Sequence, residues 1–296
     1  MTVSPGSIIY GSDYNVIQAL VTEVLGSGLP YGPTGSGDVT YGYGQPLQSS
    51  PVAPGQLITA AQWQALEADL ATAWLHQSGS TLFGPTNNNT LNVLAAAYLS
   101  NLNTASTIVT NRMQAAPTQM TTATLGSATY GAAWGDGGNA QLIGNNGSIT
   151  FPSTTAMQYF WNTGGTIRFQ GFGPNQSGST QDADWQAALS AFNFTLNYSV
   201  FTTLTSNPTQ VYYAQTQPSP YNNSWIGLSM YVSGATITWG VVYYDAVPTN
   251  YSSYWGGPNT VSAGAGYIVY ETYASGLTNV YQSTSISISN SWSVTG

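Results

Sequence analysis

Three groups of residues in this sequence have the types and spacing to do chemistry. His76 is the only histidine, so a mechanism with a histidine base must use it. Asp182 and Asp184 form a D-x-D pair, which could hold a cation or act as paired acids. Arg168, one of two arginines, follows a double glycine in "FWNTGGTIRFQGFG". This last pattern could indicate a phosphate cradle, a catalytic clamp or a bend in a sheet.

The surroundings of His76 and of the D-x-D pair favour structural roles. His76 lies in "WLHQSG", the last turn of a predicted helix, where a histidine bonds terminal carbonyls or interacts with the helix dipole. No G-x-S-x-G motif accompanies it. Asp182 and Asp184 precede "WQAAL", where carboxylates stabilise a helix N-terminus, and no further calcium ligands follow. We therefore expect helix-terminal roles, with a cation at the D-x-D pair as the alternative.

The arginine segment predicts a strand. Arg168 lies between Ile167 and Phe169, so it points to the face opposite the core. The double glycine opens no helix and no P-loop lysine follows it, which argues against a phosphate cradle. We expect the glycines to form the turn or bulge that begins the strand. We expect Arg168 to pair with a carboxylate, the D-x-D pair being nearest in sequence, or with backbone carbonyls.

The scarcity of charge excludes several classes of function. Charged residues make up 4% of the chain, against about 25% in typical soluble domains, and lysine is absent. Nucleic acids and anionic membrane surfaces are bound through Lys and Arg, so neither is an expected partner. No apolar stretch reaches the roughly 18 residues of a membrane span, and the N-terminus lacks signal-peptide features. The absence of cysteine excludes disulfides and thiolate chemistry. Neutral surfaces of this kind suit a protein that is buried in a large assembly or exposed in harsh surroundings.

Three amphipathic helices are predicted in the first third of the chain. The first, "DYNVIQALVTEVLG", begins at the cap Ser12 and ends at Gly26. The second begins with a capping box of Thr59 and Gln62 and ends near Gly79. The third is "TLNVLAAAYLSNLNTASTIVTNRM". Their apolar stripes are Val16, Ile17, Leu20, Val21, Val24 and Leu25; Trp63, Leu66, Leu70 and Trp74; and Leu91, Leu94, Tyr98, Leu102, Ala105 and Val109.

Two further features of this third bear on function. Ser27–Gln56 is rich in Gly and Pro and is predicted to be an ordered, irregular arm. We expect the arm to lie along a neighbouring subunit, because long irregular segments are usually functional. Glu67 and Asp69 lie on the flank of the second helix and are predicted to be solvated.

From Pro117 onward the apolar residues recur mostly with a period of two. A hairpin is predicted around a turn at Ser233-Gly234, and one short helix over Asp182–Phe192. The other predicted strands are Ser148–Phe151, Thr166–Phe172, Phe194–Ser199, Thr209–Gln215, Tyr267–Tyr273 and Ile286–Val294. The prediction is an α+β fold, with an N-terminal helical domain (1–116) followed by an antiparallel β-sandwich, jelly-roll-like domain (117–296).

Aromatic loops between the strands are the candidates for contact with a ligand or partner. "SPYNNSWIG" and "TNYSSYWGGPN" carry Tyr221, Trp225, Tyr251, Tyr254 and Trp255. Tyr combined with Gly, Ser and Asn is typical of adaptable recognition surfaces, where rings stack on sugars or pack on proteins. The alternative is that these rings cover the ends of the sandwich.

Several segments resemble structural proteins of tailed phages. "SDYNVIQALVTEVLGSG", "YGYGQPLQSS", "ITAAQWQALEADLATAWLHQSG" and "FWNTGGTIRFQGFG" followed by "DADWQAAL" are similar, in this order, to segments of VrlC-like virion proteins. Such proteins occur in phages of cyanobacteria and other aquatic bacteria. The similarity covers residues 12–78 and 157–189, and this chain has fewer Lys and Arg than those segments. The resemblance implies a virion component without enzymatic activity.

We therefore expect a non-enzymatic structural subunit of a tailed-phage virion, made and assembled in the host cytoplasm. It would be a tail, neck or collar, fibre-attachment or capsid accessory component. Other virion proteins and further copies of itself are its expected partners, with the helical domain docking to the particle. The alternative is a receptor- or carbohydrate-binding module of a fibre, in contact with a host surface glycan or receptor. A hydrolase that uses Asp182 or Asp184 is a third class. No catalytic residue, cofactor or metal is expected.

Overall fold

The computed structural model describes residues 9–26, 42–82, 91–130, 142–172, 180–215, 223–246, 265–274, 277 and 286–295. The chain forms two compact units, each assembled from segments far apart in the sequence. The helical unit comprises Met1–Thr121, Gln158–Gly165 and Tyr273–Tyr281, and the strand unit comprises Thr122–Met157, Thr166–Thr272 and Gln282–Gly296. The boundary predicted after residue 116 lies near the first crossing between these units. The prediction does not include the two later segments of the helical unit, Gln158–Gly165 and Tyr273–Tyr281.

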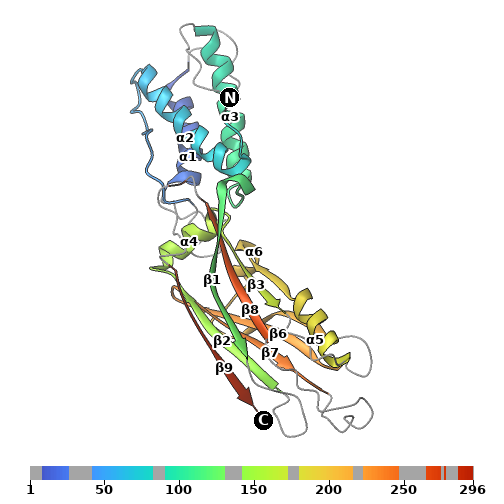
Figure 1. Ribbon diagram of the computed structural model, residues 1–296. Coiled ribbons are helices and arrows are strands. Elements are labelled where there is room, and N and C mark those ends of the chain that lie inside the picture. Colours follow the sequence, from blue (N-terminus) through green and yellow to red (C-terminus); the bar gives the residue numbers. More distant parts are fainter. Residues whose placement is uncertain are drawn as a thin grey trace, which may run out of the picture. The chain divides into compact units, whose positions relative to one another are not determined.

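Three helices, α1 (Gly11–Leu25), α2 (Ala60–Ser78) and α3 (Leu91–Thr110), pack against one another in the helical unit (Figure 1). Their apolar stripes meet in one core, which Tyr43, Val52 and Leu277 also enter. The helical residues buried there include Tyr14, Ile17, Val21, Leu66, Leu70, Ala73, Tyr98 and Ile108. The 3.6-residue apolar period predicts these helices because packing of one face supplies most of their stability.

The termini of α2 are those that the sequence predicts. The main-chain N–H of Gln62 donates to Thr59 Oγ1 at 3.2 Å, and the main-chain N–H of Thr59 donates to Gln62 Oε1 at 2.9 Å. These two bonds form the predicted capping box. Gly79, with φ of 72°, ends the helix in the left-handed region.

The start of α1 differs from the prediction. The helix begins at Gly11, so Ser12 lies within its first turn instead of capping it. The carboxylate of Asp13 accepts a hydrogen bond from the main-chain N–H of Tyr10 at 2.9 Å, because a carboxylate at this position reaches back to the cap. Val16, placed in the apolar stripe by the sequence, is 49% exposed. The end of the helix at Leu25, before Gly26, is as predicted.

The described part of the Gly- and Pro-rich arm, residues 42–56, is bonded to helices of its own unit. Asn15 donates through Nδ2 to the carbonyl of Val52, and Val52 N–H donates to Asn15 Oδ1, both at 2.9 Å. The main-chain N–H of Tyr43 donates to the carbonyl of Val24 at 2.9 Å. Contact of the arm with a neighbouring subunit stays a prediction, and residues 27–41 lie outside the described part.

The double glycine ends a helix that is not among the predicted elements, α4 (Thr154–Asn162). The N–H of Gly165 donates to the carbonyl of Phe160 at 2.9 Å, and that of Gly164 to Trp161 at 3.0 Å. These bonds, with φ of 80° at Gly164, form a Schellman cap. The next strand begins directly after it, so the glycines do form the predicted turn, as a helix cap.

Two sheets build the strand unit (Figure 1). One has the order β1-β8-β3-β4, formed by Met120–Tyr130, Ala265–Ala274, Thr166–Phe172 and Asn193–Leu196. The other is antiparallel with the order β5-β6-β7-β2-β9, formed by Thr209–Gln215, Trp225–Ser233, Thr236–Tyr244, Leu142–Thr150 and Ser287–Thr295. The short helices are η1 (Pro117–Gln119), α5 (Thr180–Ala191) and α6 (Tyr198–Phe201).

Strands β3 and β5 have the predicted bounds, and the β6–β7 hairpin turns at Gly234, with φ of 57°. The strand predicted over Phe194–Ser199 is wrong in its second half. Asn197 Oδ1 there accepts a hydrogen bond from the N–H of Val200 at 3.1 Å and caps α6. Strand β1 was not predicted, because its sequence, "MTTATLGSATY", has few apolar residues.

The predicted combination of helix and strand is confirmed at this level. Most helical residues lie in the N-terminal part, and an antiparallel five-stranded sheet follows. Among the described helices, none is both long and apolar enough to cross a membrane.

Candidate functional site: an aromatic strip on the five-stranded sheet

The hairpin of β6 and β7 gives the five-stranded sheet one buried face and one open face. Ile226, Leu228 and Met230 are fully buried, as are the alternate residues from Ile237 to Tyr243. Most residues between them are partly exposed. Successive side chains of a strand point to opposite sides, so these partly exposed residues share one surface. We call this surface the open face.

Three aromatic side chains, Tyr213, Trp225 and Tyr244, form a row across β5, β6 and β7 at one end of the open face. We call this row the aromatic strip. The ring centroids of Tyr213 and Trp225 are 5.7 Å apart with 35° between the planes, and those of Trp225 and Tyr244 are 5.6 Å apart with 30°. Tyr213 is 50% exposed, and the other two side chains are partly exposed. The strip therefore offers aromatic surface to solvent.

The side chains of two consecutive tyrosines of β5, Tyr212 and Tyr213, lie on opposite faces of the sheet. The pairing register of β5 with β6 shifts between Gln210 and Tyr212, as at a β-bulge. The ring of Tyr212 packs on Phe192 and Phe194, with centroids 4.9 and 6.5 Å apart, and burial raises the pKa of Tyr212. Tyr213 consequently lies on the open face.

Gly227 makes room for the indole of Trp225. Tyr213 pairs with Gly227 in the register, and Trp225 pairs with Tyr244. A Cβ atom on residue 227 would lie 2.9 Å from Cζ3 of Trp225, so the indole covers the backbone at this glycine. The row thus rests on main chain and is continuous between Tyr213 and Tyr244.

A buried hydrogen bond joins β6 and β7 next to the strip. Ser224, which precedes Trp225, donates through Oγ to Asp245 Oδ1 at 3.1 Å. The same Oγ accepts from the main-chain N–H of Ala246 at 3.1 Å. Asp245 follows Tyr244 and is 1% exposed. This contact fixes the strand ends that carry the two central rings.

Beyond the strip, most side chains of the open face carry hydroxyl or amide groups, Leu142 and Val242 are apolar, and the described positions include no formally charged residue. The hydroxyls of Ser148 and Ser289 are hydrogen-bonded at 2.9 Å, and those of Thr150 and Thr236 at 3.1 Å. By the register, the open-face positions of β6, β7, β2 and β9 beyond the strip are Gly227, Ser229, Tyr231, Ser233, Thr236, Thr238, Gly240, Val242, Leu142, Gly144, Asn146, Ser148, Thr150, Ser287, Ser289, Ser291 and Ser293. Binding to such a surface depends little on ionic strength.

One of the five aromatic residues predicted to contact a ligand or partner, Trp225, lies in the strip. The other four, Tyr221, Tyr251, Tyr254 and Trp255, lie outside the described residues. Tyr213 and Tyr244 are not among the predicted residues, because the prediction considered loops. Alternation along β7 was a usable signal for Tyr244, since it follows the buried Tyr243.

His76 is a buried structural residue in the helical unit. It lies in the last turn of α2, as predicted, but its Nε2 donates to the carbonyl of Thr163, at 2.9 Å, and not to its own helix. Nδ1 is buried and has no hydrogen-bond partner, and the Tyr43 ring packs edge-on at 5.0 Å. Burial lowers the pKa of His76 to about 4, and the bond to Thr163 only partly opposes this. The imidazole is therefore neutral at pH 7.

The D-x-D pair lies near the start of α5, as predicted. Burial raises the pKa of Asp184, and its Oδ2 has no hydrogen-bond partner. The side chain of Asp182 is outside the described part. In the part of the chain that the structure describes, no group of three His, Cys, Asp or Glu residues could hold a metal ion.

Arg168 lies in β3 between the buried residues Ile167 and Phe169 and is itself partly exposed, as the alternation predicts. In the register it pairs with Thr195 of β4. An ion pair with a carboxylate of the D-x-D pair stays a prediction.

The prediction that Asp69 is solvated is wrong, because this residue is 2% exposed. Its Oδ2 accepts hydrogen bonds from Ser49 N–H at 2.8 Å and Ser49 Oγ at 2.6 Å. Its Oδ1 accepts one from Gln48 N–H at 3.0 Å. Glu67 is partly buried and accepts from Trp63 Nε1 at 3.0 Å. The carboxylate of Asp69 thus holds residues 48 and 49 against α2 instead of facing solvent.

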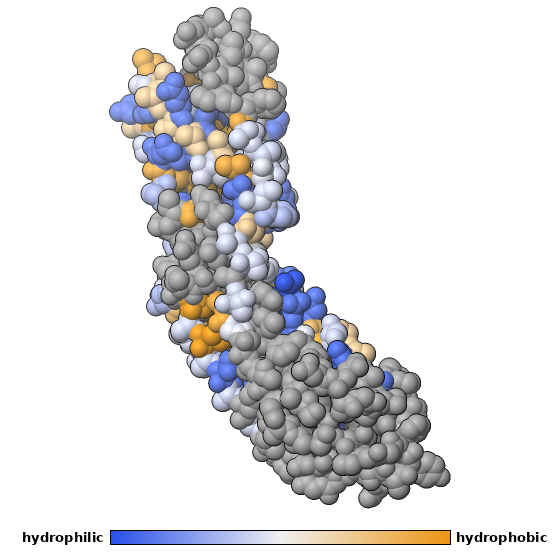
Figure 2. Space-filling model, viewed as in Figure 1, coloured by the Kyte–Doolittle hydropathy of each residue, from blue (hydrophilic) through white to orange (hydrophobic). Residues whose placement is uncertain are grey.

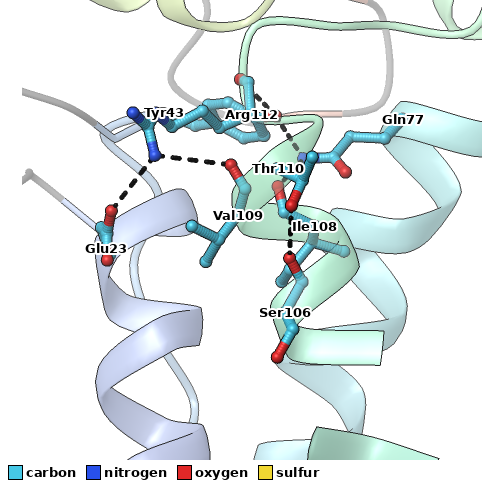
Figure 3. A network of polar contacts seen from close by, with 8 residues as sticks. All are labelled: Glu23, Tyr43, Gln77, Ser106, Ile108, Val109, Thr110 and Arg112. Carbon is cyan, nitrogen blue, oxygen red and sulfur yellow. Dashed lines mark hydrogen bonds and ion pairs between the residues drawn. The ribbon is translucent and has the colours of Figure 1, made fainter. Parts of the chain in front are cut away.

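A polar network joins the ends of the helices to residue 43 (Figure 3). Gln77 Nε2 donates to the hydroxyl of Tyr43 at 2.8 Å and to the carbonyl of Ile108 at 2.9 Å, and the Tyr43 hydroxyl donates to the carbonyl of Arg112 at 2.9 Å. Burial raises the pKa of Tyr43. Arg112 Nη1 also forms an ion pair with Glu23 at 3.5 Å. The network connects α1, α2 and α3, which is a structural role.

The aromatic strip is thus the candidate functional site, and it is equipped for stacking and for neutral hydrogen bonding. Comparisons of the chain with protein-family models, with curated proteins and with solved structures give no match.

Proposed function

We propose that the chain is a non-enzymatic structural subunit of a tailed-phage virion that acts through protein–protein assembly. In this proposal it is a tail, neck or collar, fibre-attachment or capsid accessory component, and it forms homo-oligomers. The virion part of the proposal rests on the resemblance that the sequence of residues 12–78 and 157–189 suggests.

The observation that carries the assembly role is the exposure of large apolar side chains on the helical unit. Leu57, two residues before the cap of α2, is 91% exposed, and Tyr10, Val16 and Leu99 are 65%, 49% and 38% exposed. Figure 2 shows apolar residues in orange interspersed with hydrophilic ones on the visible surface of this unit. A partner subunit that covered these side chains would gain the free energy of removing them from water. We therefore assign docking to the helical unit.

The experiment is incorporation into particles. Phages that carry Leu57→Ser should contain fewer copies of the protein, measured by quantitative mass spectrometry of purified virions. Ser50→Ala, at an exposed residue of the same unit, is the control and should be incorporated normally. Absence of the wild-type protein from purified particles would refute the proposal.

We also propose that the two sheets of the strand unit form a sandwich. The ring of Phe169 in β3 meets that of Trp239 in β7 edge-to-face, with centroids 5.7 Å apart, and both are buried. This contact joins the four-stranded and five-stranded sheets through their buried sides, as sandwich packing requires.

The second candidate function is a receptor- or carbohydrate-binding module of a phage fibre. The aromatic strip favours it, because exposed rings on a neutral sheet face suit recognition of a ligand.

A further inference from the structure

We propose that the aromatic strip binds an uncharged glycan, with sugar rings stacked on Tyr213, Trp225 and Tyr244. This inference rests on the second candidate function and is independent of the assembly role. It differs from the sequence-based expectation in placing the site on the sheet and not in loops.

The geometry of the rings is the first step. Neighbouring planes meet at 35° and 30° with centroids 5.7 and 5.6 Å apart, so each ring contacts the next and the three form one aromatic row across three strands. A pyranose with equatorial hydroxyls presents C–H groups on its faces and hydroxyls around its rim. Such a ring can cover an aromatic side chain while its hydroxyls stay bonded to water or protein. Tyr213, with half of its surface exposed, is the most accessible position for this contact.

The electrostatics select an uncharged ligand. The described positions of the open face include no Asp, Glu, Lys, Arg or His. An acidic polysaccharide or a nucleic acid would lose water at its charges and gain no opposite charge in return. A neutral glycan has no such cost, and its binding would be insensitive to salt.

The neighbours of the strip supply hydrogen-bonding groups for sugar hydroxyls. Gln215 is exposed and pairs with Trp225 in the register. Ser229, four residues after Trp225 on β6, pairs with Gly240, and Asn146 pairs with Gly240 from β2. Leu142, opposite Tyr244, and Val242 continue the strip with apolar surface, and the hydroxyl and amide groups of Ser229 and Asn146 follow at Gly240, four residues from Tyr244. A surface that places aromatic rings beside hydroxyl and amide groups suits a sugar.

The binding experiment uses the purified full-length chain. We would titrate neutral β-linked oligosaccharides of glucose, N-acetylglucosamine, galactose and mannose, and an oligogalacturonate as the acidic probe, by calorimetry at low and high salt. We expect at least one neutral probe to bind, with little change of affinity with salt. We expect the acidic probe not to bind. Absence of binding by all neutral probes, or preference for the acidic one, would overturn the inference.

Variants test whether the strip is the site. Tyr213→Ala and Trp225→Ala should each weaken binding by roughly tenfold or more, as expected for loss of one stacked ring. Tyr213→Phe should retain binding, because the ring is kept. Tyr231→Ala is the matched control, since it removes a tyrosine from the same face of β6, away from the strip. If circular dichroism shows that Trp225→Ala does not fold, the test rests on Tyr213→Ala, which changes a half-exposed side chain. Equal affinity of Tyr213→Ala and the wild type would refute the assignment.

These results are separable from those on assembly. Loss of glycan binding with normal incorporation into virions would support the strip and leave the docking role intact. Protection of Tyr213 by a second copy of the chain, seen as dimers that Tyr213→Ala dissolves, would overturn the glycan inference in favour of a protein interface.

Discussion

His76 Nε2 lies 2.9 Å from the main-chain oxygen of Thr163, a residue 87 positions further along the chain. The bond joins the last turn of α2 to the C-terminal cap of α4. Nδ1 of the same ring is buried without a partner, so a second proton there would have no acceptor. A neutral imidazole is therefore part of the folded structure.

We predict that acidification destabilises the protein through His76. Its pKa is about 4 in the folded chain and 6.5 by reference when exposed, so the unfolded state binds more protons between these values. The free energy of unfolding should fall as the pH is lowered from 6.5 to 4, by on the order of 3 kcal/mol for this group. Urea unfolding of the wild type and of His76→Gln at several pH values measures the difference. Equal pH slopes for both proteins would contradict the prediction.

Removing the buried carboxylate of Asp69 should cost more than removing one of its donors. Asp69→Ala leaves the N–H groups of Gln48 and Ser49 without their acceptor, which should lower the free energy of unfolding by roughly 2–4 kcal/mol. Ser49→Ala removes only the hydroxyl bond and should cost about 1 kcal/mol. Urea unfolding at pH 7 gives both values. A smaller effect for Asp69→Ala than for Ser49→Ala would be evidence against this role.

Substitution of two glycines of β2, Gly147 and Gly144, should lower the stability of the protein by different amounts. A Cβ atom on Gly147 would overlap the main-chain oxygen of Ser289 and the buried ring of Trp239. Gly147→Ala should therefore destabilise the protein by about 2 kcal/mol or more. In Gly144→Ala the nearest atom is Oγ of Ser293, an exposed side chain that can rotate, so the loss should be well under 1 kcal/mol. Thermal melts of the two variants test this order, and the reverse order would refute the packing at Trp239.

The cap of α2 offers a fourth test. Thr59→Ala removes the side-chain acceptor for Gln62 N–H and should lower stability by about 1 kcal/mol. Thr59→Ser keeps the hydroxyl and should stay within a few tenths of a kcal/mol of the wild type. Chemical unfolding of the pair isolates the capping contribution, and equal losses in both variants would show that the hydroxyl bond is not its source.

The sequence predicts elements well where local signals coincide. Helix α2 has a capping box, an apolar stripe and a terminal glycine, so its bounds follow from neighbouring residues alone. The short α4 has a cap, Ser153, whose Oγ accepts from the N–H of Ala156 at 3.0 Å, but no capping box, and it combines β-branched with aromatic residues, so its glycines read as a turn. Asp69 is buried because residues 48 and 49 return to it, which is a contact between distant parts of the chain.

The aromatic strip could be predicted only in part, for the same reason. The type of Trp225 and its surroundings indicate a contact residue. That Tyr213 and Tyr244 lie next to Trp225 follows from the pairing of the strands and from the register shift in β5. Neither the pairing nor the shift can be predicted from the sequence of one segment. Alternation places each ring on a face, but pairing decides which rings meet.

The helical unit is built from three separate segments of the chain, which affects the order in which its parts are synthesised on the ribosome. Its segments end at Thr121, Gly165 and Tyr281, with parts of the strand unit between them. The acceptor of the His76 bond and the buried Leu277 therefore leave the ribosome long after α3. The nascent helices must wait for nearly the whole polypeptide before their core is complete, so a release of the chain at residue 121 would yield an unfinished unit.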